Sequence, residues 1–446
     1  MMGRRALRRA AWALVALAAL VALRIALGKS LGDWVAARER ARFEREVGSL
    51  DPSRLASPEV PASKNAVPAI NRGVTALALA ADERARLGSF ERGETVSTRE
   101  LEAFDDWLAG SDAALEILAS AAGRPRSSFG PRRELFHGGH LDATRWLAAS
   151  RLRAADGERG LARGEARRVE RSLGTLRGLV IALRREPLPT FALLGDAIEV
   201  RHLALLQMGL RQGKYGQLLR TAREQLESLA ELPGAAEIAF GEAVYGHEML
   251  RREMPAARRP TSLRERFEAL LWPWSPAHVE AGYLEGWREL HALAQRPQTQ
   301  WSAVELRFGA RHSQLRRWID PTVPFEAVKS ILMPNLLEIV RRLQLLRSSE
   351  QLARLAVETA LRGLETGAPA ATSAALPGSE TPDAATGSPP TYTVGTDGIA
   401  VVELAAARAL VESTWRAAAL PQRHLHERRA RLLRWEVAPP ARGALR

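Results

Sequence analysis

An uninterrupted apolar run near the N-terminus constrains this chain more than any other feature. The eighteen residues Ala10–Leu27 include a single charge, Arg24. A helix needs about 20 apolar residues to cross a bilayer, and an arginine near the end of such a run can reach the headgroups. We therefore predict a transmembrane helix over residues 10–27. Its anchor residues are Trp12, Leu14, Leu17, Leu20 and Leu23.

Positive charge on one side of this run predicts its orientation. Arg4, Arg5, Arg8 and Arg9 precede it, and the cytoplasmic flank of a membrane helix is enriched in arginine and lysine. We expect a single-pass protein of the bacterial inner (cytoplasmic) membrane, with its N-terminus in the cytoplasm and its body outside. The alternative is a signal peptide cleaved near Ala26–Gly28, which would leave a secreted or periplasmic body.

Composition narrows the partners that this chain can have. Its 446 residues are enough for two or three domains, and the absence of cysteine excludes disulfides and thiolate metal sites. The net charge is +13 at pH 7, and a basic surface attracts lipid headgroups or acidic polymers. The arginines are scattered among glutamates, however, which is typical of compositional bias. We expect no nucleic-acid partner.

Helical periodicity dominates residues 65–365. Leucines recur at spacings of three and four, and glycine or proline interrupts them, for example at Pro187 and Gly213. Successive helices joined by short turns form an α-hairpin array or a bundle, solenoid-like in outline but without a fixed repeat. The predicted fold class is therefore mainly α, with an N-terminal transmembrane helix and one small C-terminal β-hairpin.

The segments around this helical body differ from it in composition. Residues 29–50 are rich in charge and have no apolar stripe, which predicts a solvated stalk helix after the anchor. Near the C-terminus, Gly395–Gly398 indicates a hairpin turn. The segments are 1–9 (basic start), 29–50 (stalk helix), 51–64 (linker), 366–390 (flexible low-complexity segment), 391–404 (β-hairpin), 405–422 (helix) and 423–446 (basic tail, at the surface or disordered).

One polar cluster has the residue types of a metal site. His137, His140 and Asp142 lie close together in sequence, and on a single helix two or three of them would share a face. Gly138 and Gly139 favour a loop instead, so we prefer helix-start and surface roles. The alternative function is a metal-dependent envelope hydrolase that uses these three residues. Otherwise we predict no catalytic residues and no cofactor.

A second candidate concerns lipid contact. The proline-bounded stretch 255–276 combines basic with aromatic residues, which is typical of segments at a bilayer surface. Tryptophan more often covers a core, and we prefer that interpretation. The candidate interfacial patch consists of Arg258, Arg259, Phe267, Trp272 and Trp274.

The C-terminal region contains a short motif. Residues 382–392 read Pro-Asp-Ala-Ala-Thr-Gly-Ser-Pro-Pro-Thr-Tyr, and Asp397-Gly398 follows. This layout resembles a family of uncharacterised bacterial single-span membrane proteins, in which a Pro-Asp…Gly…Tyr element leads from a helical extracytoplasmic body into a short hairpin. Ala384 and Ile399 depart from the family's proline and aromatic residue. The resemblance implies a topology and no known activity.

These features together predict a membrane-anchored helical scaffold or protein-interaction protein of the bacterial cell envelope. Its expected partners are the membrane, through the N-terminal helix, and a protein of the envelope. No motif among those tested predicts an enzyme.

Overall fold

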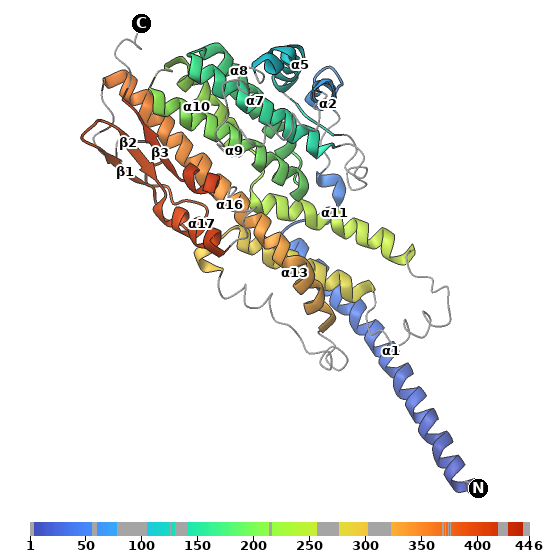
Figure 1. The fold of residues 1–446 in the computed structure, drawn as a ribbon. Coiled ribbons are helices and arrows are strands. Elements are labelled where there is room, and N and C mark those ends of the chain that lie inside the picture. Colours follow the sequence, from blue (N-terminus) through green and yellow to red (C-terminus); the bar gives the residue numbers. More distant parts are fainter. Residues whose placement is uncertain are drawn as a thin grey trace. The chain divides into compact units, whose positions relative to one another are not determined.

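The computed structural model describes most of the chain. The described residues are 4–55, 60–77, 105–124, 126–129, 141–213, 216–256, 276–301, 323–367, 370, 372, 374, 376–417 and 427–439. Within them the chain is mainly helical with one small antiparallel sheet, as predicted (Figure 1).

The chain forms two compact units, each assembled from separate stretches of sequence. The first unit comprises residues 1–55, 239–293 and 301–338, and the second comprises 56–238, 294–300 and 339–446. The division therefore falls inside α11 (Ala235–Ala256) and α16 (Val323–Thr366).

In the first unit, the C-terminal half of α1 (Arg4–Glu46) packs against α11 and α13 (Pro276–Ala294). Phe43 is fully buried, and its ring centroid lies 6.4 Å from that of Phe240 on α11. Ala36 is buried together with Ala281 of α13. The predicted solvated stalk is therefore wrong for this half of α1. Ala36 and Phe43 lie seven residues apart, a seam too narrow to be recognised among so many charges.

Ion pairs with α13 also hold the C-terminal half of α1 in place. Arg40 lies 3.1 Å from Glu280 of α13, and Arg288 of α13 lies 3.1 Å from Glu46. Gly246 of α11 approaches the Tyr283 ring so closely that any side chain there would collide with the phenol. Charge, apolar burial and close packing thus hold α1, α11 and α13 together.

The N-terminal half of α1 contains the predicted anchor. Its backbone is one continuous helix through residues 10–27. Across the part of the chain that the structure describes, no helix combines the length and the apolar character that crossing a membrane requires. The anchor stays a prediction. The side chains of several residues named for it lie outside the described residues, namely Leu14, Leu17, Leu20, Leu23, Arg4, Arg5, Arg8 and Arg9.

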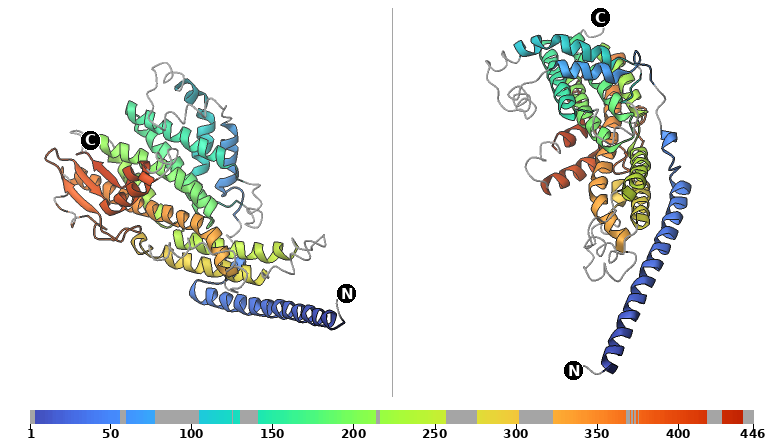
Figure 2. Two further views of the ribbon diagram at one scale, coloured as in Figure 1. Left: turned by 60° about the horizontal axis from the view of Figure 1, so that its bottom comes forward. Right: turned by 90° about the vertical axis from the view of Figure 1, so that its right-hand side faces the viewer.

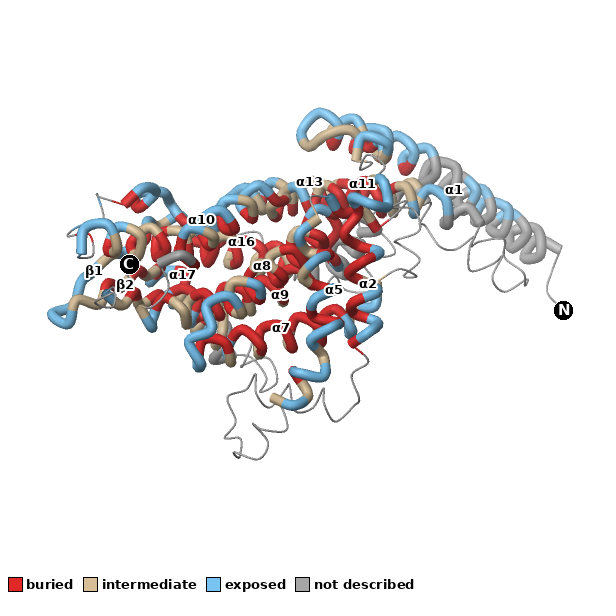
Figure 3. The backbone as a smooth tube through the Cα atoms, turned by 90° about the horizontal axis from the view of Figure 1, so that it is seen from above, coloured by how far each residue is buried: buried red, intermediate tan, exposed pale blue. Residues whose placement is uncertain are grey.

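The second unit is built on a helical bundle. α7, α8 and α9 all pack against one another, and each of them contains many buried residues (Figure 3). This mutual packing is that of a bundle rather than of an open array. Its helices are α2 (Ala66–Ala76), α5 (Asp112–Ala122), α7 (Ala143–Arg163), α8 (Ala166–Arg184), α9 (Pro189–Gln212), α10 (Gly216–Ala230) and the second part of α16.

Turn chemistry explains where these helices end. Gly164 follows α7 with φ +73° and Gly213 follows α9 with φ +66°, a left-handed conformation that other residues rarely adopt. Pro189 begins α9, where its missing N–H costs no helical hydrogen bond. Two short 3-10 helices, η1 (Pro52–Leu55) and η2 (Gln298–Gln300), lie outside the bundle.

A three-stranded antiparallel sheet completes the second unit, with strand order β1-β2-β3 (Figures 1 and 2). β1 (Thr391–Val394) and β2 (Ala400–Glu403) form the predicted hairpin, and α17 (Ala405–Ala417) follows. β3 (Arg434–Val437) pairs with β2 and was not predicted.

The predicted basic tail is therefore wrong for residues 427–439, which form a short helix and β3. Trp435 is fully buried opposite Val402 in the register. Leu433, Trp435 and Val437 alternate as a half-buried strand requires, but arginines surround them in the sequence. Beyond the strand, the Ala438 N–H donates to the carbonyl of Leu210 on α9.

The Pro-Asp motif forms a fixed turn against α16. The buried Asp383 carboxylate accepts the N–H groups of Ala385 at 2.8 Å and Thr386 at 2.9 Å, and the hydroxyl of Ser348 at 2.8 Å. Gly387 (φ +75°) closes the turn by donating to the Asp383 carbonyl. The prediction of a flexible segment over 366–390 is thus corrected for this part, because a buried, multiply bonded carboxylate holds it in place.

Candidate binding groove and buried ionic network

A groove of about 720 Å³ opens in the second unit between α10 and α16. Polar side chains line it from both helices at spacings of three and four, so each helix presents one charged stripe. Leu376 and Pro377 form a third side. The stripe on α10 consists of Arg220, Arg223, Glu224 and Glu227, and the stripe on α16 of Glu358, Leu361, Arg362, Glu365 and Thr366.

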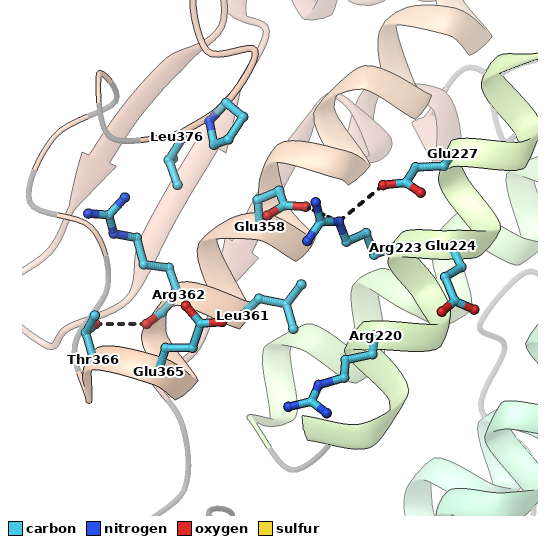
Figure 4. Close-up of a pocket in the computed structure, with 11 residues that line it drawn as sticks. Arg220, Arg223, Glu224, Glu227, Glu358, Leu361, Arg362, Glu365, Thr366 and Leu376 are labelled. Atoms are coloured by element: carbon cyan, nitrogen blue, oxygen red, sulfur yellow. Dashed lines mark hydrogen bonds and ion pairs between the residues drawn. The ribbon is translucent and has the colours of Figure 1, made fainter.

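Arg223 connects the two stripes (Figure 4). Its Nε lies 3.2 Å from Glu227 on its own helix and 3.0 Å from Glu358 on α16. Arg220, one turn away, makes no hydrogen bond or ion pair with any residue that the structure describes. The groove therefore offers a free guanidinium beside a bridged one.

The chemistry of this groove suits binding by charge complementarity. Arg223 and Glu227 are more than half exposed, and exposed ion pairs contribute only about 0–1 kcal/mol each. Such pairs exchange at low cost for pairs with an incoming partner. Because positive and negative side chains alternate along the groove, a bound segment would need negative and positive side chains at the matching positions.

A second cleft, of about 430 Å³, lies between α5, α7 and α8. Its centre is the buried Asp156, which accepts from Arg153 at 2.9 Å and from Arg168 at 2.6 Å. Burial lowers the pKa of Arg153. Near the rim, Asp105 pairs with Arg163 at 2.7 Å. Most of the carboxylates that line this cleft are thus neutralised by arginines, and the main effect is to join α7 to α8.

A buried ionic network joins α8, α9 and α16. Nη1 of Arg184 donates to Glu199 and, over 2.5 Å, to Glu350, which also pairs with Arg347 at 2.7 Å. Burial and then repulsion from Glu350 raise the pKa of Glu199 well above its usual range. Burial opposes ionisation of Glu350 too, but Arg184 and Arg347 lower its pKa overall. These surroundings therefore favour the protonated form of Glu199 and the ionised form of Glu350.

The first unit contains two buried or half-buried glutamates, Glu242 and Glu280, whose pKa values shift in opposite directions. Burial raises the pKa of Glu242 to about 7, while the nearby Tyr283 hydroxyl donates to the Glu242 backbone carbonyl at 2.9 Å. Burial also acts on Glu280, but the bond to His247 at 2.7 Å and the charge of Arg40 lower its pKa overall. Glu280 thus stays ionised where it holds α1.

Only one of the predicted metal-site residues lies in the described part of the chain. Asp142 is the N-cap of α7, and its side chain accepts the Arg145 N–H at 3.1 Å. This is the preferred helix-start role. Among the described residues, no group of three histidine or carboxylate side chains could hold a metal ion. The other candidates lie outside the described residues, namely His137, His140, Arg258, Arg259, Phe267, Trp272 and Trp274.

Neither the groove nor the buried ionic network was predicted from the sequence. The two groove stripes look like ordinary solvated helix faces, because nothing local shows that they oppose each other. The sequence does contain a pattern that indicates the buried ionic network. Arg184 and Glu199 interrupt strongly apolar stretches, and a charge inside an apolar face requires a buried partner.

Comparisons of the chain with profiles of protein families, with curated proteins and with solved structures find no match. Function must therefore be inferred from the geometry and chemistry of these residues.

Proposed function

We propose that this protein is a membrane-anchored helical scaffold that holds a protein partner at the extracytoplasmic face of a bacterial inner membrane. The observation that carries the proposal is the course of α1. This helix continues without a break from the predicted anchor to Phe43, which is buried against α11.

This continuity favours a retained anchor over a cleaved leader. Ala26–Gly28, the alternative cleavage site, lies inside the helix, nineteen residues before the end of α1 at Glu46. A helix that runs unbroken from the predicted anchor to a buried core residue supports retention of the anchor. We therefore keep the transmembrane interpretation of residues 10–27 as the basis of the proposal.

We propose the groove between α10 and α16 as the partner site. Its volume of about 720 Å³ lies within the range of about 300–1,000 Å³ that is usual for ligand sites. The unpaired Arg220 and the exchangeable Arg223 pairs supply charge that a partner can meet. A polypeptide segment with alternating acidic and basic residues fits this chemistry best.

A site-specific crosslink tests the groove. A photo-crosslinking residue replaces Leu361 in the full chain, which is expressed in its native membranes. We expect one protein adduct of defined mass, lost when Arg220→Glu reverses the free charge. Arg72→Glu is the matched control, because Arg72 is exposed on α2 and does not line the groove. An adduct that survives Arg220→Glu, or that Arg72→Glu removes equally, would exclude the groove.

Protease protection tests the anchor independently. Spheroplasts carrying the C-terminally tagged chain are treated with protease, and the untreated band is compared with the full-length translation product. We expect full length before treatment and digestion from outside. A shorter band would indicate cleavage, and a protected body would reverse the topology.

A further inference from the structure

Among the side chains of α1 that the structure describes, four large apolar ones are exposed. Trp12 is 73% exposed and Val15 58%, whereas Leu31 is 40% and Trp34 58% exposed. Large apolar side chains grouped on a surface commonly mark an interaction site. Trp12 and Val15 lie inside the predicted anchor, and Leu31 and Trp34 lie just beyond its C-terminal end, on a helix that buries Ala36 and Phe43 in the body.

The spacing of the two tryptophans matches the thickness of a bilayer. Trp12 and Trp34 are 22 residues apart on one continuous helix, which corresponds to about 33 Å along the axis and about 40° around it. The hydrocarbon core of a bilayer is about 30 Å thick, and tryptophan is enriched at both of its interfaces. This spacing would allow both tryptophans to lie at the two aromatic belts, with Lys29 and Asp33, which follow the predicted anchor, near the belt at Trp34.

The side chains around Trp34 follow the order of polarity at a membrane surface. Leu31, Trp34 and Arg38 lie three and four residues apart, so they share one helix face. The Arg38 guanidinium carbon lies 5.4 Å from the centroid of the Trp34 ring, within cation–π distance. Along the helix, an apolar, an aromatic and a cationic side chain would meet the hydrocarbon edge, the interface and the phosphate layer in turn.

The folded body begins immediately after this face. Ala36, two residues beyond Trp34, is already buried with Ala281, and Arg40 pairs with Glu280. No length of free helix separates the tryptophan from the packed helices α11 and α13. A helix that leaves the bilayer at Trp34 therefore enters the protein core within one turn.

We propose that Leu31, Trp34 and Arg38 form a lipid-contacting interfacial face, which docks the first unit directly on the anionic headgroup layer of the bilayer. The partner is the lipid surface itself. This inference rests on the proposed anchor, and it replaces a stalk that would lift the body into solvent.

The absence of cysteine makes a depth measurement straightforward. Single cysteines at Ala19, Ser30 and Ala41, all exposed on α1, carry a nitroxide label in the full chain, reconstituted into phosphatidylcholine–phosphatidylglycerol vesicles. Power saturation with oxygen and with a water-soluble nickel complex reports the depth of each label. We expect the label at 19 deep in lipid, the label at 30 at the hydrocarbon edge and the label at 41 in water.

Trp34 itself is tested by fluorescence. The fluorescence of Trp34 is obtained by subtracting the spectrum of Trp34→Phe from that of the native chain. Lipids brominated near the carbonyl end of the acyl chain should quench most of this fluorescence. The corresponding difference for Trp107→Phe, in the second unit, is the control and should not be quenched.

The outcomes separate the inference from the anchor proposal. A deep label at 19 combined with a water-exposed label at 30 and an unquenched Trp34 would keep the anchor and overturn the interfacial face. A water-exposed label at 19 would overturn both. A deep label at 19, an edge label at 30 and a quenched Trp34 support the interfacial face.

Discussion

Glu199 and Glu350 occupy the same buried network, but replacement by glutamine should destabilise the protein much less at position 199 than at position 350. Burial and repulsion from Glu350 raise the pKa of Glu199, which favours its neutral form. The pKa of Glu350 is lowered, so it stays ionised between Arg184 and Arg347. Glutamine resembles a protonated glutamate, so it should suit position 199 and not position 350.

The magnitudes follow from the contacts. Glu350→Gln removes a charge that two guanidiniums meet at 2.5 and 2.7 Å, and breaking a buried ion pair costs about 3–5 kcal/mol. Glu199→Gln keeps an acceptor for Arg184 and a donor for Glu350, so it should change the free energy of unfolding by less than about 1 kcal/mol. The expected gap between the two variants is at least about 2 kcal/mol.

The assay is urea unfolding of the full chain in detergent at pH 7, followed by circular dichroism. Glu227→Gln serves as the control, since that carboxylate is 60% exposed, and it should leave the midpoint unchanged. The pH dependence gives a second readout. Stability from neutral Glu199 is complete below its ordinary pKa of 4.5 and is lost as pH rises toward its folded pKa. Stability from ionised Glu350 is present above 4.5 and is lost as pH falls below it. Equal destabilisation by the two variants, or a larger effect of Glu199→Gln, would refute the opposite pKa shifts of the two carboxyl groups.

Three further predictions concern other parts of the fold. Because the pKa of Glu242 is raised from 4.5 to about 7, stability should fall between pH 4.5 and 7 by up to roughly 3 kcal/mol. Glu242→Gln should flatten this fall in urea midpoints, and an unchanged slope would contradict it. Asp383→Ala should cost about 2–3 kcal/mol and make residues 376–390 the earliest site of limited proteolysis; cleavage at the native rate would argue against the fixed turn. Phe43→Ala should cost about 3–5 kcal/mol in thermal unfolding, whereas the exposed neighbour substitution Glu44→Ala should not; equal effects would mean that α1 is not packed.

Local patterns predicted the elements of this fold well because each pattern acts over a few residues. Helical periodicity was expected up to residue 365, and α16 ends at Thr366. The hairpin was expected over residues 391–404, and its strands are Thr391–Val394 and Ala400–Glu403. β3 escaped prediction because the alternation around Trp435 is short and flanked by arginines.

Pairings across the chain could not be predicted in the same way. Arg184 and Glu350 are 166 residues apart, and no local pattern brings one to the other. The same holds for the groove, whose two stripes come from α10 and α16. The bond between Asp383 and Ser348 of α16 likewise joins residues that are distant in the sequence, and the expected flexible segment over 366–390 gave no sign of it.

The assembly of the first unit from distant stretches imposes an order on biosynthesis. α1 leaves the ribosome first, yet α11 and α13, which bury Phe43 and Ala36, follow only after roughly 190 further residues. At translation rates of about 5–20 residues per second, this wait lasts about 10–40 seconds. During that interval the nascent chain must carry an unpaired apolar seam, while the intervening bundle has most of its own helices and can begin to fold. Helices α11 and α13 therefore close on α1 long after α1 has been made.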